Sequence, residues 1–172
     1  MKKQHSEDKY LLNAKHIHLI GIGGSGMCPI AELLQSRGYV VTGSDKSEND
    51  NVKQLKGLGI TVYGEHKAEN INGADIVAYS AAVPHNNPEL VAAENMNIPA
   101  MERSELLGAL TRCYDNVIGV CGTHGKTTVT SMITQILLIN KCKPNAVIGG
   151  KLPMADSACI VGDYQTLVCE SC

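Results

Sequence analysis

The 172-residue chain is long enough for one domain or two small ones, and its 44% apolar and 19% charged residues exclude general disorder and a fibrous repeat. A net charge of −2 gives no electrostatic reason to expect nucleic acid or an anionic membrane as a partner, and 3% aromatic residues do not suit stacking on single-stranded nucleic acid. Seven scattered cysteines and the lack of a long apolar segment favour a cytoplasmic protein without a signal peptide or membrane insertion.

Apolar runs alternate with helical patterns along the first part of the chain, separated by glycines and other turn residues. Strands are predicted at residues 16–20, 39–43, 60–63 and 75–79, and helices at 25–37, 50–58, 88–95 and 104–112. This alternation with short connections is typical of a parallel sheet covered by helices. We therefore expect an α/β protein whose first domain is Rossmann-like.

The pattern restarts near residue 113. Strands are predicted at 117–121, 146–148, 159–161 and 166–169, and a helix is predicted at 127–140. We expect the apolar stripe of this helix to be a core face. The sequence thus predicts two domains, 1–112 and 113–172, each with a parallel sheet.

The first glycine turn reads Gly21-Ile22-Gly23-Gly24-Ser25-Gly26-Met27, a G-x-G-x-x-G pattern between a predicted strand and a predicted helix. Glycines permit the tight turn, and free amides at the start of the helix attract a diphosphate. Asp45 follows the second predicted strand, where dinucleotide-binding folds carry a ribose-binding carboxylate, although a solvated loop acid is the alternative. NAD, FAD and a UDP-sugar all present a diphosphate, so the motif alone leaves the ligand open.

The second glycine turn reads Gly122-Thr123-His124-Gly125-Lys126-Thr127-Thr128 and again joins a predicted strand to a predicted helix. Backbone amides in such a loop cradle phosphates, the lysine binds the β- and γ-phosphates, and the hydroxyl after it can ligate magnesium. The standard spacing requires glycine where Val120 stands. We therefore interpret the segment as a shorter variant of the P-loop.

The phosphate loop G-T-H-G-K-T-T and the upstream segment H-L-I-G-I-G-G-S-G-M at 18–27 together resemble the Mur ligases of peptidoglycan synthesis. The similarity covers essentially the whole chain, including segments 43–45, 80–83, 87–89 and 103–107. It implies a three-domain enzyme that joins an amino acid to a UDP-muramyl substrate through an acyl phosphate. UDP-N-acetylmuramate, ATP and L-alanine are the implied substrates, and Mg²⁺ is the implied metal.

The resemblance also implies roles for individual residues. The UDP-sugar is assigned to Gly21, Gly23, Gly24, Ser25, Gly26, Met27, Ser44, Asp45 and Ser80. ATP is assigned to Gly122, Thr123, His124, Gly125, Lys126, Thr127 and Thr128, with Lys126 as the catalytic residue, and magnesium to Thr127 and Glu170. His124 stands where other family members carry asparagine, and it is either a spacer or a reacting group. The alternative for Glu170 is an edge-strand or terminal acid that binds no metal.

The chain stops at Cys172, before the remainder of such an ATP domain, so we expect the truncated start of a P-loop ATP-binding α/β domain and an inactive isolated fragment. Three alternatives stay open. They are a tripeptide ligase of cell-wall recycling, a non-catalytic UDP-sugar-binding fragment, and a nicotinamide-dependent oxidoreductase. The last leaves the loop 122–128 unexplained. The sequence does not predict an oligomeric state.

Overall fold

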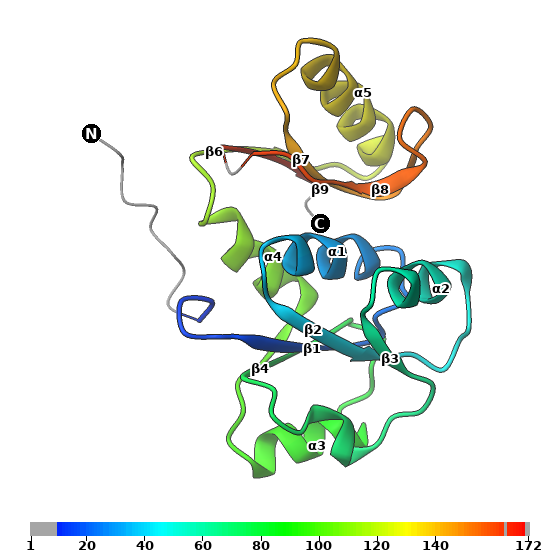
Figure 1. The fold of residues 1–172 in the computed structure, drawn as a ribbon, viewed down its shortest axis with the longest axis vertical. Coiled ribbons are helices and arrows are strands. Elements are labelled where there is room, and N and C mark those ends of the chain that lie inside the picture. Colours follow the sequence, from blue (N-terminus) through cyan, green and yellow to red (C-terminus); the bar gives the residue numbers. More distant parts are fainter. Residues whose placement is uncertain (1–9, 164, 171–172) are drawn as a thin grey trace. The chain divides into compact units, whose positions relative to one another are not determined.

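The computed structural model of the chain describes residues 10–163 and 165–170. They form two compact units, one of residues 13–106 and one of residues 10–12 and 107–170. Both contain helices and strands (Figure 1), so the predicted α/β class is confirmed. The boundary predicted between residues 112 and 113 stays a prediction. None of the described helices is long and apolar enough to cross a membrane.

The unit of residues 13–106 is built on a parallel five-stranded sheet with the order β3-β2-β1-β4-β5, as predicted for a Rossmann-like domain. Its strands are β1 (His16–Ile20), β2 (Val40–Ser44), β3 (Thr61–Tyr63), β4 (Ile76–Tyr79) and β5 (Ala100–Glu102). Its helices are α1 (Cys28–Ser36), α2 (Asp50–Gly57), the 3₁₀ helix η1 (Ala68–Ile71) and α3 (Pro88–Asn95), and α4 (Arg103–Thr111) begins at its end. Periodicity does not predict β5 or η1, because segments this short show no clear period.

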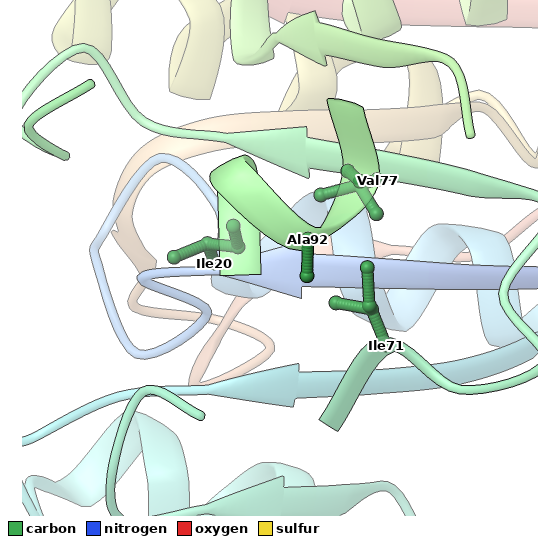
Figure 2. Close-up of a cluster of buried hydrophobic side chains, with 5 residues drawn as sticks. Ile20, Ile71, Val77 and Ala92 are labelled. Atoms are coloured by element: carbon green, nitrogen blue, oxygen red, sulfur yellow. The ribbon is translucent and has the colours of Figure 1, made fainter. Parts of the chain in front are cut away.

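Helices cover both faces of this sheet (Figure 1). On the face of α3, a buried cluster joins β1 and β4 to α3 and η1 (Figure 2); it consists of Ile20, Ile71, Val77, Ala92 and Ala93. The helices α1 and α2 lie on the other face. A strand between two covered faces is buried at successive positions. Residues 17–20 of β1 are accordingly all buried, and His18 among them needs polar partners inside the unit.

The second unit contains β6 (Asn116–Val120), α5 (Lys126–Ile139), β7 (Asn145–Leu152), β8 (Ser157–Ile160) and β9 (Thr166–Glu170). Its sheet has the order β6-β9-β7-β8, with parallel pairs β6–β9 and β9–β7 and an antiparallel pair β7–β8. The prediction of a fully parallel sheet is therefore wrong for β8. The connection 153–156 is too short for the crossover that a parallel neighbour needs, so it forms a hairpin.

The apolar stripe of α5 is only partly a core face, which corrects the prediction. Ile133, Leu137 and Leu138 pack against the buried cluster of β7 and β9. Four further apolar side chains of this helix are exposed: Val129, Met132, Ile136 and Ile139. The apolar surface of α5 is thus wider than the face that its own sheet covers.

Candidate functional site

A cleft of about 550 Å³ opens in the unit of residues 13–106, among the loops that follow β1, β2, β3 and β4. The chain runs from β1 outward to β3 and then returns to the other side of β1 with β4, so the strand order reverses between β1 and β4. Open parallel sheets bind their ligands at this switch point. The cleft is lined by Gly21, Gly24, Asp45, Lys46, His66, Ser80, Ala82, Val83, Pro84, Asn86, Asn87 and Pro88.

The glycine turn after β1 is held by the end of β2. The amides of Gly21 and Ile22 donate to the Ser44 carbonyl, at 2.8 and 3.2 Å. The Gly23 amide donates to Asp45 Oδ2 at 2.9 Å. Gly21 has a φ of +77°, a conformation that glycine adopts without strain. Asp45 is therefore part of the support of the turn as well as part of the cleft wall.

Two amides of the turn remain available to a ligand. The Gly24 carbonyl accepts the amides of Met27 and Cys28, at 3.0 and 2.9 Å. The amides of Ser25 and Gly26 donate to no acceptor within the described residues. They lie just before Met27, the N-cap of the nine-residue helix α1, where the helix dipole favours negative charge. The turn is therefore suited to bind an anionic group such as a diphosphate.

Gly23 has no room for a side chain. A Cβ at this position would lie 2.6 Å from Val52 Cγ2 and 2.9 Å from Asp45 Oδ2. We expect Gly23→Ala to lower the free energy of unfolding by about 1–3 kcal/mol through overpacking, measured by urea denaturation. Gly57→Ala is the matched control, since a Cβ there meets nothing within 4 Å. Equal stability of the two variants would contradict the close packing of the turn.

The structure brings some of the predicted UDP-sugar residues to the cleft. Those that line it are Gly21, Gly24, Asp45 and Ser80. Those that do not are Gly23, Ser25, Gly26, Met27 and Ser44. The side chains of Met27 and Ser44 are buried, because Met27 belongs to the apolar core and Ser44 belongs to a polar network behind the cleft.

Glu89 of α3 lies at the centre of this buried network. Its Oε2 accepts a hydrogen bond from Ser44 Oγ at 2.6 Å and lies 2.9 Å from His66 Nδ1. Its Oε1 accepts a hydrogen bond from Asn70 Nδ2 at 2.7 Å and lies 3.3 Å from His18 Nε2. The latter contact is close enough for an ion pair but lacks the alignment of a hydrogen bond. Of these residues, only His66 also lines the cleft.

The position of Glu89 is set by the start of α3. Asn87 caps this helix by accepting the Glu89 amide at 2.8 Å, and Pro88 occupies its first turn. Burial alone would raise the pKa of Glu89, but the contacts with His18, Ser44 and Asn70 outweigh burial and hold the pKa below its usual range. The carboxylate is therefore ionised at neutral pH.

A depressed pKa of Glu89 makes the folded state sensitive to acid. A carboxyl group with a lower pKa in the folded state adds stability above its unfolded pKa, about 4.3, and loses it as the pH falls through the folded pKa. We expect the free energy of unfolding to decrease below about pH 4.3 and to decrease less in Glu89→Gln. Urea denaturation at several pH values measures this difference, and parallel curves for parent and variant would contradict it.

Sequence reasoning does not assign several cleft residues, among them Lys46, His66 and Asn86. The resemblance singles out segments 80–83 and 87–89, yet it assigns only Ser80 to the ligand. The positions of Lys46 and Asn86 could have been found from the predicted topology. Both follow parallel strands, and the loops after parallel strands meet at one edge of the sheet. His66 has no motif around it, and only its place between β3 and η1 brings it to the cleft.

The second candidate site is the loop between β6 and α5. Lys126 Nζ donates to the Gly122 carbonyl at 2.6 Å, so the lysine lies over its own loop. Gly125 precedes α5 with a φ of +76°. Residues 121–125 are exposed, as are Thr127 and Thr128. The loop therefore offers an accessible ammonium group and backbone amides at the start of a helix.

Thr127 and Glu170 both lie against the glycine pair of β7. Glu170 Oε1 accepts the Gly149 amide at 2.7 Å, and Thr127 Cγ2 would lie 3.4 Å from a Cβ at Gly150. Glu170 also pairs with Val120 at the end of the strand that leads into the loop. A hydroxyl and a carboxylate are suitable ligands for Mg²⁺. The described residues hold no group of three or more His, Cys, Asp or Glu that could bind a metal, so phosphate oxygens or water would complete the shell.

The chain belongs to the Mur ligase family: residues 16–114 match the model of the Mur ligase catalytic domain. The chain is similar to the UDP-N-acetylmuramate–L-alanine ligase of Legionella pneumophila, with 46% identity over 91% of this chain and 33% of the relative. The ligase of the same name from Persephonella marina is 45% identical over 91% of this chain and 34% of its own length. The chain thus spans about a third of the length of these curated relatives.

Solved structures agree with the fold. The UDP-N-acetylmuramate–alanine ligase from Thermotoga maritima superposes with a TM-score of 0.84 and 31% identity, over 91% of this chain and 37% of that protein. A ligase from Neisseria meningitides, named for UDP-N-acetylmuramate and a tripeptide, superposes with a TM-score of 0.83 and 28% identity. The match covers 91% of this chain and 52% of that protein. These similarities confirm the predicted family.

Proposed function

We propose that this chain carries the UDP-sugar-binding unit and the ATP-binding loop of a cytoplasmic ligase, which uses ATP and Mg²⁺ to join L-alanine to UDP-N-acetylmuramate in peptidoglycan synthesis. The observation that carries the proposal is the presence in one chain of a cleft at the switch point of a parallel sheet and a phosphate loop between β6 and α5. The names of the relatives at 40–46% identity support L-alanine over a tripeptide, since the tripeptide ligase is 28% identical.

The residues would act as follows. The diphosphate of the UDP-sugar binds the free amides of Ser25 and Gly26 at the start of α1, beside the loops that line the cleft. The phosphates of ATP bind the loop amides and Lys126. Thr127 and Glu170 would hold the magnesium. When bound, this ion neutralises the charge on the transferred phosphoryl group.

We expect calorimetry to show saturable binding of UDP-N-acetylmuramate to the chain and no binding of NADH. Ala82→Trp should weaken sugar-nucleotide binding by at least about tenfold, because an indole would fill part of the cleft. The neighbouring exposed residue Ala81 does not line the cleft, and Ala81→Trp should retain the affinity within about twofold. Binding of NADH without the sugar nucleotide, or equal loss in both variants, would contradict the proposal.

A further inference from the structure

His66 connects the cleft to the buried network behind it. The residue lies between β3 and η1, its side chain is 15% exposed, and it is one of the residues that line the cleft. Its Nδ1 faces inward, 2.9 Å from both Ser44 Oγ and Glu89 Oε2. Within the described residues, no hydrogen bond reaches Nε2. One nitrogen of the ring is therefore fixed by the protein, and the other is available to a ligand.

The hydrogen atoms of the network can be assigned from its donors and acceptors. Glu89 is ionised, and an ionised carboxylate only accepts hydrogen bonds. Ser44 has one hydroxyl hydrogen and donates it to Glu89 Oε2 at 2.6 Å, so it faces His66 as an acceptor. Both partners of His66 Nδ1 thus accept. A stable contact requires the hydrogen to be on Nδ1.

We propose that Glu89 is a positioning residue that keeps the proton of His66 on Nδ1, so that Nε2 faces the cleft as a hydrogen-bond acceptor for a hydroxyl or N–H group of the ligand. The inference deepens the proposed function and rests on it for the identity of the ligand as a UDP-sugar. It places a neutral donor of the nucleoside or sugar against His66, rather than a phosphate oxygen. A phosphate oxygen accepts hydrogen bonds and would instead require a proton on Nε2.

Nitrogen NMR of the free chain decides the assignment without any ligand. At about pH 8.5, above the ordinary titration range of histidine, the two ring nitrogens of a neutral imidazole have distinct ¹⁵N shifts that identify the protonated one. We expect His66 to carry its proton on Nδ1. A ring that is protonated on Nε2, or doubly protonated, at this pH overturns the inference.

Two variants test whether Glu89 is responsible. In Glu89→Gln, the amide can present either its oxygen or its NH₂ group to His66, so we expect the Nε2-protonated form to appear. Ser44→Ala is the matched control, because it removes a neighbour of Nδ1 but leaves the Glu89 contact, and it should keep the parent tautomer. Glu89→Asp retains a carboxylate, and His66 should keep the parent tautomer in this variant as well. A parent-like tautomer in Glu89→Gln overturns the positioning role, and if that variant does not fold, a changed tautomer in Ser44→Ala overturns it.

Ligand binding tests the consequence at the cleft. We expect His66→Leu to bind UDP-N-acetylmuramate about tenfold more weakly than the parent, and His66→Gln, which retains an acceptor, to lose about threefold or less. Pyrophosphate, the probe for the phosphate subsite, should bind parent and His66→Leu equally. If His66→Leu loses as much affinity for pyrophosphate as for the sugar nucleotide, or loses no affinity for the sugar nucleotide, the inference is overturned. A parent chain that binds neither contradicts the proposed function, while the NMR result still decides the tautomer.

Discussion

Replacement of Glu89 by alanine should lower the free energy of unfolding of the unit of residues 13–106 by about 3–5 kcal/mol. The variant removes the acceptor of Ser44 Oγ and Asn70 Nδ2 and the carboxylate beside two histidines, yet leaves all these groups inside the unit. Buried polar groups without partners cost more than the net gain from their hydrogen bonds. Because small domains are stable by only about 5–15 kcal/mol, this loss is a large part of the total.

Urea denaturation at pH 7, followed by circular dichroism, measures the effect. Glu94→Ala is the matched control, since Glu94 lies on the same helix but is exposed, and we expect it to change stability by about 0.5 kcal/mol or less. A similar stability of both variants would show that the network around Glu89 contributes little to folding.

The glycine turn illustrates what local sequence predicts well. The strand β1 ends at the predicted residue, and the turn and α1 follow in the predicted order. The glycines of a tight turn and a continuous apolar run can each be recognised in a short segment of sequence. The start of α1 at Cys28, three residues later than predicted, reflects the use of residues 25–27 in the turn itself.

The network around Glu89 could not be predicted in this way. Glu89 and Ser44 are 45 residues apart, and Glu89 and Asn70 are 19 residues apart. In the sequence, Glu89 follows Asn87 and Pro88 and has the pattern of an ordinary acid in the first turn of a helix. Its burial follows from the packing of α3 and η1 on one sheet, which periodicity does not describe. His18, between Ile17 and Leu19 of the predicted first strand, was a local sign of a polar partner, because an imidazole buried in a strand needs one.

The direction of the strands in the second unit could likewise not be predicted from the sequence. A short apolar run has the same appearance in a parallel and an antiparallel pair, and only the short connection 153–156 distinguishes them. The exposure of Val129, Met132 and Ile136 likewise depends on what packs against α5, and not on the stripe alone. Sequence periodicity therefore predicts that a face is apolar but does not predict what covers it.

Lys126→Ala should weaken binding of Mg²⁺–ATP to the chain by about 10- to 100-fold, because a hydrogen bond to a charged group contributes about 1.5–3 kcal/mol. In the structure, the ammonium group donates to the Gly122 carbonyl, within the loop that presents its amides at the start of α5. A phosphate at this position would gain a charged donor that alanine cannot replace.

Titration with ATP in the presence of magnesium, followed by calorimetry, measures this loss, and Lys151→Ala is its control. Lys151 belongs to the same unit, is exposed, and forms a surface ion pair with Asp156 at 3.5 Å, so its removal should change ATP affinity by less than about twofold. An affinity within twofold of the parent in Lys126→Ala would show that this lysine does not contact the phosphates. A parent chain without saturable ATP binding would contradict the assignment of the loop itself, because its amides and its ammonium group are already accessible in this structure.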